Sequence, residues 1–214
     1  MKFLTTLILL LCFTNAGKAQ EYLRDILGRP IRELAFIDVV GSPFANDEFL
    51  KGNVILNNDD EYENVPLKYN IYNDELYFKN AKDEMLLSFV IPVKWFKLAG
   101  QTYLNGFPEV DNFTKNSFYG LLAGNKIKLL FKSYKTILES RPYNSPHAEK
   151  RFESYKVYFI LKEGKMYRFK PSKKDLLDLF ASSGSKIEDY IKKEKVNLKN
   201  DEDLVKLFDF INTL

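Results

Sequence analysis

Apolar and polar residues alternate along much of the chain between residues 33 and 161. The alternation is clearest in three runs, at residues 65–71, 127–131 and 155–161. A period of two places successive side chains on opposite faces of a strand and is typical of a half-buried strand. Polar turn residues separate the runs, as at residues 57–60, 73–74 and 162–165. The pattern predicts short strands joined by hairpin turns, which favours a curved, partly barrel-like antiparallel meander.

The hydrophobic period changes after Pro171. Ser172 and Asp175 have the spacing of a helix cap, Ser185 and Glu188 repeat it, and Asn200 precedes a third helical stripe. That stripe follows the helical spacing, with Leu204, Leu207, Phe208 and Ile211 at i, i+3, i+4 and i+7. We therefore predict an α+β fold, mainly β, with two or three short C-terminal helices. Residues 20–214 are expected to form a single globular domain, because no long linker divides them.

The N-terminus has the layout of a cleaved secretory signal. Lys2 precedes an apolar stretch at residues 3–13, and Gly17 and Ala19 place small residues at −3 and −1 before Gln20. The stretch is about half of the ~20 residues that a membrane-spanning helix needs. Residues 1–19 are therefore predicted to be removed, and the mature chain is predicted to be exported without a transmembrane helix.

Cysteine chemistry is not expected in the mature protein. Cys12 is the only cysteine, and it lies inside the predicted signal. Leu11 before it is not the small residue that a lipoprotein signal requires, so we interpret Cys12 as part of the apolar stretch. The mature chain then has no disulfide, thiolate nucleophile or cysteine metal ligand, and its length is enough to fold without a disulfide.

Charge is balanced after the predicted cleavage. The chain has 32 basic and 29 acidic residues, and removing Lys2 and Lys18 leaves 30 against 29, a net charge of +1. Such balance gives no reason to expect a nucleic-acid partner, and export argues further against one.

Acidic residues occur repeatedly beside predicted turns. They form four groups, Asp47-Glu48, Asp59-Asp60-Glu61, Asp74-Glu75 and Asp83-Glu84. A glycosidase needs two carboxylates facing each other across a cleft, and nothing in this spacing indicates that arrangement. Residues 57–61 are rich in oxygen ligands but lack the glycine and distant glutamate of an EF-hand loop. We interpret all four groups as ordinary turn chemistry.

No other residue pattern indicates a catalytic, cofactor or metal site. His147 is the only histidine and lies in a Pro-rich segment, which is a poor place to hold a catalytic base or a zinc ligand. The lysines at 126, 128 and 132 are predicted to share a solvated strand face, and those at 192, 193 and 195 to end a helix. Residues 112–114 match the glycosylation sequon, a pattern that often occurs by chance.

Two features leave a binding function open. Aromatic residues gather in the central third of the chain, at Trp95, Phe96, Tyr103, Phe107, Phe113, Phe118 and Tyr119. They are expected to fill the core, and the alternative is an apolar ligand held in a curved sheet. Residues 140–151, with Pro142 and Pro146, are predicted to form an exposed hairpin loop that is either a recognition element or idle surface.

Three segments resemble a group of uncharacterised exported proteins of Bacteroidetes-type bacteria. They are residues 41–52, which begin Gly-Ser-Pro-Phe-Ala-Asn-Asp-Glu-Phe, residues 65–74, and the C-terminal run from residue 173 to residue 212. An Ala-Gln junction like that at residues 19–20 is also usual in this group. The resemblance implies a periplasmic or outer-membrane-facing location and implies no activity.

The sequence thus predicts an exported cell-envelope protein that acts by non-enzymatic binding, with an envelope protein as the expected kind of partner. A carrier for a lipid or other apolar ligand is the first alternative. A hydrolase with unidentified carboxylates is the second, and the lack of any motif-bearing Ser, Cys or His argues against it.

Overall fold

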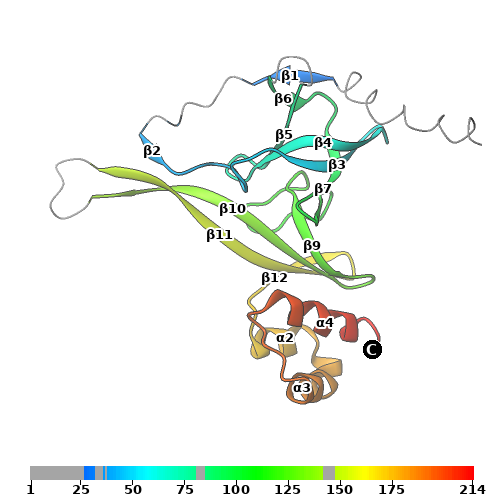
Figure 1. Ribbon diagram of the computed structural model, residues 1–214. Helices are drawn as coiled ribbons and strands as arrows, with labels where there is room; N and C mark the ends of the chain where they lie inside the picture. The colour runs from blue at the N-terminus through cyan, green and yellow to red at the C-terminus, as the bar shows by residue number, and fades with distance from the viewer. Residues whose placement is uncertain (1–26, 32–35, 37, 81–84, 142–147) are drawn as a thin grey trace, which may run out of the picture.

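The computed structural model describes residues 27–31, 36, 38–80, 85–141 and 148–214. Within these residues a twelve-stranded sheet is followed by three α-helices and a short 3₁₀-helix (Figure 1). The strands are β1 (Gly28–Pro30), β2 (Val39–Val40), β3 (Leu50–Leu56), β4 (Glu61–Asn70), β5 (Glu75–Lys79), β6 (Leu86–Phe89), β7 (Val93–Leu98), β8 (Gln101–Leu104), β9 (Tyr119–Gly124), β10 (Lys128–Ser140), β11 (Glu149–Lys162) and β12 (Lys165–Phe169). The helices are α2 (Lys173–Leu179), η2 (Ala181–Ser183), α3 (Gly184–Lys193) and α4 (Asp201–Ile211).

Two antiparallel meanders make up the sheet. Strands β3 to β6 form the first, β7 to β12 form the second, and the pairing of β3 with β7 joins them. β1 extends the sheet beyond β6, and β2 pairs in parallel with β11. This architecture confirms the mainly-β α+β fold with C-terminal helices. The sheet is open and does not curl into a barrel, because the described strands at its two ends, β1 and β12, do not pair with each other.

The strand pattern read from the sequence matches the burial of the side chains. Val65, Leu67 and Tyr69 of β4 are all buried, and they face a core formed with β3, β5, β6 and β7. A second core lies between the C-terminal helices and strands β9 to β12. In Figure 1 these helices lie below the long β10–β11 hairpin, and β3, β4 and β5 lie above it. The hairpin is therefore the layer that separates the two cores.

Two of the C-terminal helices, α2 and α4, begin at caps that the sequence predicts. The Ser172 hydroxyl accepts from the Asp175 N–H, and the Asn200 side chain accepts from the Asp203 N–H. The cap predicted at Ser185 is wrong. Because η2 leads directly into α3, the chain is already helical at Gly184, and Ser185 lies inside the helix.

The hairpin of β10 and β11 is longer than the sequence predicts. Ser140 pairs with Glu149, and Arg151 pairs with both Leu138 and Val40, so both ends of the predicted 140–151 loop belong to strands. Residues 142–147, including Pro142, Pro146 and His147, lie outside the described residues, as do the predicted signal at residues 1–19 and Cys12. None of the helices in the described residues is both long and apolar enough to span a bilayer.

Candidate functional site

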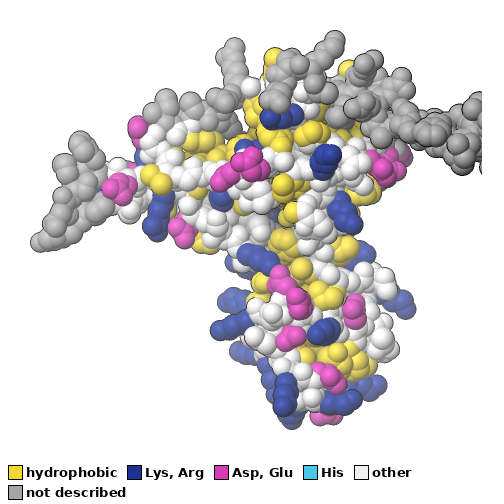
Figure 2. All heavy atoms as spheres, in the orientation of Figure 1, with side chains coloured by type: hydrophobic (Ala, Val, Ile, Leu, Met, Phe, Trp, Pro, Cys, Tyr) yellow, Lys and Arg dark blue, Asp and Glu magenta, His cyan; other side chains and the backbone are white. Residues whose placement is uncertain are grey.

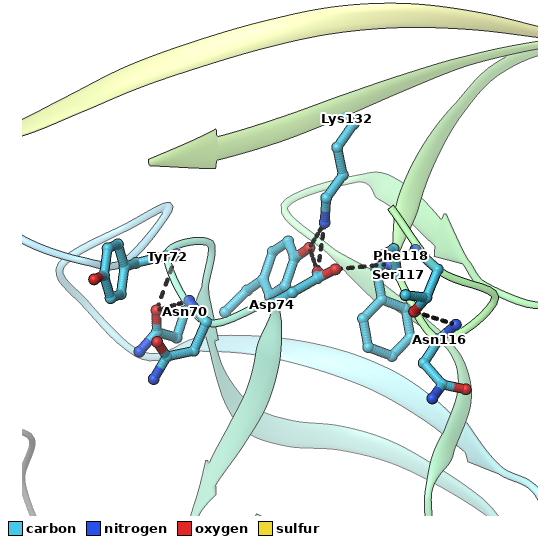
Figure 3. Close-up of polar contacts among 10 residues, drawn as sticks. Asn70, Tyr72, Asp74, Asn116, Ser117, Phe118 and Lys132 are labelled. Atoms are coloured by element: carbon cyan, nitrogen blue, oxygen red, sulfur yellow. Dashed lines mark hydrogen bonds and ion pairs between the residues drawn. The ribbon is translucent and has the colours of Figure 1, made fainter. Parts of the chain in front are cut away.

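The turn between β4 and β5 directs an acidic side chain toward the long hairpin. The Asn70 side-chain oxygen accepts from the backbone N–H groups of Tyr72 and Asn73, each at 3.0 Å, and so holds the turn. Asp74 ends the turn with a φ of 61°, a left-handed conformation that Asp tolerates better than most residues. Its carboxylate therefore points toward β10, as Figure 3 shows.

Lys132 of β10 meets this carboxylate in the interior. Its Nζ lies 2.5 Å from Asp74 Oδ1 and 3.1 Å from the Tyr69 hydroxyl oxygen. The Tyr69 hydroxyl itself donates to Asp74 Oδ1 at 2.5 Å. The Lys132 side chain is only 2% exposed, so the ammonium is satisfied inside the protein rather than by water.

The solvated face predicted for Lys132 is therefore wrong, whereas Lys126 is exposed as expected. Lys132 shares a strand face with Leu130, which is fully buried. The segment between β8 and β9, residues 105–118, covers this face. The centroid of the Phe113 ring in that segment lies 5.8 Å from Lys132 Nζ. Leu130 between the lysines was the one sequence signal that this face is not fully solvated.

Burial changes the acid–base behaviour of the groups in this cluster. It lowers the pKa of the Lys132 ammonium, and the Asp74 carboxylate opposes that change. Burial, and after it the Asp74 charge, raise the pKa of Tyr69 well above its ordinary value, so the phenol stays protonated and donates. Burial also raises the pKa of Tyr119, whose hydroxyl has no hydrogen-bond partner among the described residues.

Asp74 also connects the cluster to the 105–118 segment. Its second oxygen, Oδ2, accepts from the backbone N–H of Phe118 at 3.3 Å (Figure 3). One carboxylate thus connects the β4–β5 turn, β10 and the end of the 105–118 segment. Because the groups that could act as acid or base are engaged with one another, the arrangement serves to position these segments.

Asp74 and Phe118 also line an open groove of about 1000 Å³. Strands β5, β6 and β7 contribute one part of its wall, and the 105–118 segment contributes another. The volume lies at the upper end of the ~300–1000 Å³ found for ligand sites. The groove is the candidate binding site.

Aromatic rings and side-chain amides both line this groove. Phe89 and Trp95 are half-buried, and Trp95 is the only tryptophan of the chain. The Asn105 amide nitrogen donates to the Val93 carbonyl at 2.8 Å, which fixes its orientation. The side-chain amides of Asn57 and Asn116 make no hydrogen bond with any described residue, so they are available to a ligand.

The charge of the groove is predominantly positive. Four basic residues line it, Arg29, Lys94, Lys115 and Lys128, against the acidic residues Asp74 and Glu75. Lys94 is paired with Asp59 at 2.6 Å, and Asp74 is neutralised by Lys132. No described residue forms an ion pair with Arg29 or with Lys115.

Glu75 accepts a 2.5 Å hydrogen bond from the Tyr77 hydroxyl. Burial and then this bond raise the pKa of Tyr77 to about 12. The carboxylate of Glu75 is therefore engaged by a neutral donor, and it does not offset Arg29 or Lys115 by direct pairing.

Among the described residues, the other acidic residues singled out in the sequence do not line the groove. Asp47 and Glu48 are exposed, and Asp60 accepts from the Asn58 side chain within the turn. In the described part of the chain, no three His, Cys, Asp or Glu side chains converge as metal ligands. Asp83, Glu84 and His147 fall outside that part.

Lys192, Lys193 and Lys195 are exposed, as predicted for the end of a helix, and Asn112 of the sequon is exposed in a turn. On the face drawn in Figure 2, basic and acidic side chains are interspersed over the C-terminal helices. The central aromatic residues mainly fill the core, because Phe96, Phe107, Phe118 and Tyr119 are buried. The half-buried rings of the groove and the cations that pair with no described acid come from separate strands and from the 105–118 segment, so no run of residues in the sequence marks them.

Comparison with known protein families, with curated proteins and with solved structures found no match for this chain.

Proposed function

We propose that this protein is an exported cell-envelope protein that binds a partner without chemical transformation, and that the groove is its binding surface. The observation that carries the proposal is one open groove of about 1000 Å³ that combines half-buried rings with amides and cations that no described side chain engages. These are groups that recognise a ligand by stacking, hydrogen bonding and charge. Export rests on the signal pattern of residues 1–19.

The Lys132–Asp74–Tyr69 cluster favours binding over hydrolysis. A general acid or base must reach the reacting group of a substrate within hydrogen-bond distance. Lys132 is enclosed, and Asp74 accepts from Lys132, Tyr69 and the Phe118 N–H. The cluster therefore supports the groove wall, and a hydrolase using carboxylates remains the weaker alternative.

A carrier for an apolar ligand would use the same groove, through Phe89 and Trp95. A purely apolar molecule would bury these cations and amides without giving them new hydrogen-bond partners. Such burial costs free energy and opposes binding. The amides and cations of the groove therefore favour a polar partner.

The test combines localisation with groove-dependent binding. The full chain is produced in its own host, its N-terminus is sequenced, and the isolated protein is measured by native mass spectrometry. We expect cleavage after Ala19 and a bound molecule that is lost in the Lys115→Glu variant. Lys199→Glu is the matched control, because Lys199 is also an exposed lysine but lies before α4, outside the groove. Retention of residues 1–19, or binding that Lys115→Glu leaves intact, would contradict the proposal.

A further inference from the structure

The groove offers positive charge that no described acid neutralises. Arg29 comes from the edge strand β1 and Lys115 from the 105–118 segment, so two separate elements contribute exposed cations to one concave surface. Lys128 adds a third cation, whose Nζ donates to the Asn125 carbonyl rather than to a carboxylate. Carboxylate or sulfate groups are the complementary partners, because charge-assisted hydrogen bonds to them are the strong ones.

The uncharged groups of the groove match a sugar ring better than a lipid chain. A sugar presents apolar C–H faces that stack on aromatic rings, and hydroxyl groups that both donate and accept. Trp95 and Phe89 supply such rings. Asn57 and Asn116 each supply a donor and an acceptor in one side chain.

An acidic peptide fits the groove less well than an acidic glycan. Extended peptides commonly bind by adding a strand to an open sheet edge, where main-chain hydrogen bonds provide the affinity. Of the described strands that line the groove, only β1 has an open edge, and β1 is three residues long. β5 lies between β4 and β6, and β7 lies between β3 and β8. The recognition groups left in the groove are side chains.

We propose that the groove binds an acidic oligosaccharide, with Arg29 and Lys115 pairing with its anionic groups, Asn57 and Asn116 bonding its hydroxyls, and Trp95 stacking on a sugar ring. This inference rests on the proposed function and adds the chemical class of the ligand.

Trp95 makes the site measurable, because the only tryptophan of the chain reports on the groove. The mature protein is titrated with oligogalacturonate, which carries carboxylates, and with chondroitin sulfate fragments, which also carry sulfates. Trp95 fluorescence and calorimetry are recorded. Malto-oligosaccharide, poly-glutamate and phosphatidylglycerol vesicles are the neutral, peptide and lipid comparisons. We expect at least one acidic glycan to bind, to change the Trp95 emission and to weaken as salt rises.

The double variant Arg29→Gln/Lys115→Gln should bind that glycan about tenfold more weakly, which corresponds to about 1.4 kcal/mol. The matched control Lys193→Gln/Lys199→Gln removes the same charge from exposed positions outside the groove and should bind as the wild type does. A thermal melt of each variant checks that the fold is kept.

The inference is overturned if neither acidic glycan binds, if malto-oligosaccharide, poly-glutamate or the vesicles bind as tightly, or if both double variants behave alike. A groove-dependent bound molecule in the native mass spectrum, together with no acidic-glycan binding, would leave the proposed function standing and remove this inference. If the protein binds an acidic glycan but keeps residues 1–19 in its host, this inference stands and the export part of the proposed function is removed.

Discussion

Lys132 Nζ lies 2.5 Å from Asp74 Oδ1, although four strands separate β4 from β10 in the order of the sheet. The contact is therefore a tertiary one, made across the interior and not along a strand ladder. A backbone hydrogen bond from the Lys135 N–H to the Ile71 carbonyl, at 3.2 Å, accompanies it. Together these contacts fix the β4–β5 turn on the long hairpin. They also fix one wall of the groove, because Asp74 lines it.

Replacing Lys132 by Met should destabilise the protein strongly. The substitution leaves the Asp74 carboxylate partly buried without its cation, and breaking a buried pair in this way costs about 3–5 kcal/mol. The free energy of unfolding in urea measures the loss. Lys156→Met is the control, because Lys156 pairs with Asp201 at a partly exposed site where an ion pair is worth about 1 kcal/mol or less.

A double-mutant cycle separates the ion pair from the volume change at Lys132. Asp74→Asn keeps an oxygen for the Phe118 N–H and removes the charge. In the Asp74→Asn background, Lys132→Met should cost clearly less than in the wild type. Equal costs in both backgrounds would show that Lys132 stabilises the fold through packing alone.

Two buried tyrosines of the same region should respond in opposite ways to loss of the hydroxyl. Tyr69→Phe removes a donor to Asp74 and an acceptor for Lys132, which should cost about 1–3 kcal/mol. Tyr119→Phe removes a hydroxyl that has no partner among the described residues, so it should be neutral or stabilising. Urea unfolding of both variants decides the matter, and a loss at Tyr119 as large as at Tyr69 would reveal an unrecognised partner.

Gly124, the last residue of β9, should not tolerate a side chain. Its φ is +121°, and a Cβ there would lie 1.9 Å from the Ile127 carbonyl oxygen, a backbone atom that cannot easily move. Gly124→Ala should therefore cost about 1–3 kcal/mol through steric overlap, in addition to the backbone strain. Gly100→Ala is the matched control, because Gly100 also has a positive φ of +78° but nothing lies within 4 Å. Thermal melts that place the two variants at the same Tm would contradict this reading.

The Lys173–Glu188 pair should make the contact between α2 and α3 sensitive to acid. Lys173 Nζ lies 2.6 Å from Glu188 Oε1, and this hydrogen bond and charge lower the pKa of Glu188 below its ordinary value of 4.5. Because the folded carboxyl binds its proton at a lower pH than the unfolded one, the stabilisation is complete above pH 4.5. It is lost as the pH falls through the lowered pKa.

An NMR titration of Glu188 checks this prediction. We expect its pKa to rise toward 4.5 in Lys173→Met and to stay unchanged in Lys174→Met, which alters the neighbouring exposed lysine. The stability difference between the wild type and Lys173→Met should shrink between pH 7 and pH 3.

Several elements could be predicted from the sequence because the forces that create them are local. The alternation of Val65, Leu67 and Tyr69 specifies a strand with one buried face, and β4 has that face in the core. Ser172 and Asn200 satisfy backbone donors of the turn that follows them, so their helix starts are fixed within a few residues. Ser185 has the same spacing, but its position inside α3 follows from the preceding turn η2.

Only the tertiary structure decided the environment of Lys132 and the location of the groove. The sequence places Lys132 and Leu130 on one face of a strand, because side chains of a strand alternate. It does not specify what covers that face. The β4–β5 turn and the 105–118 segment, both distant in sequence, bring Asp74 and Phe113 over Lys132 and leave Arg29, Trp95 and Lys115 around one groove. Contacts of this kind depend on the three-dimensional path of the whole sheet, whereas residue periodicity reports only on local backbone geometry.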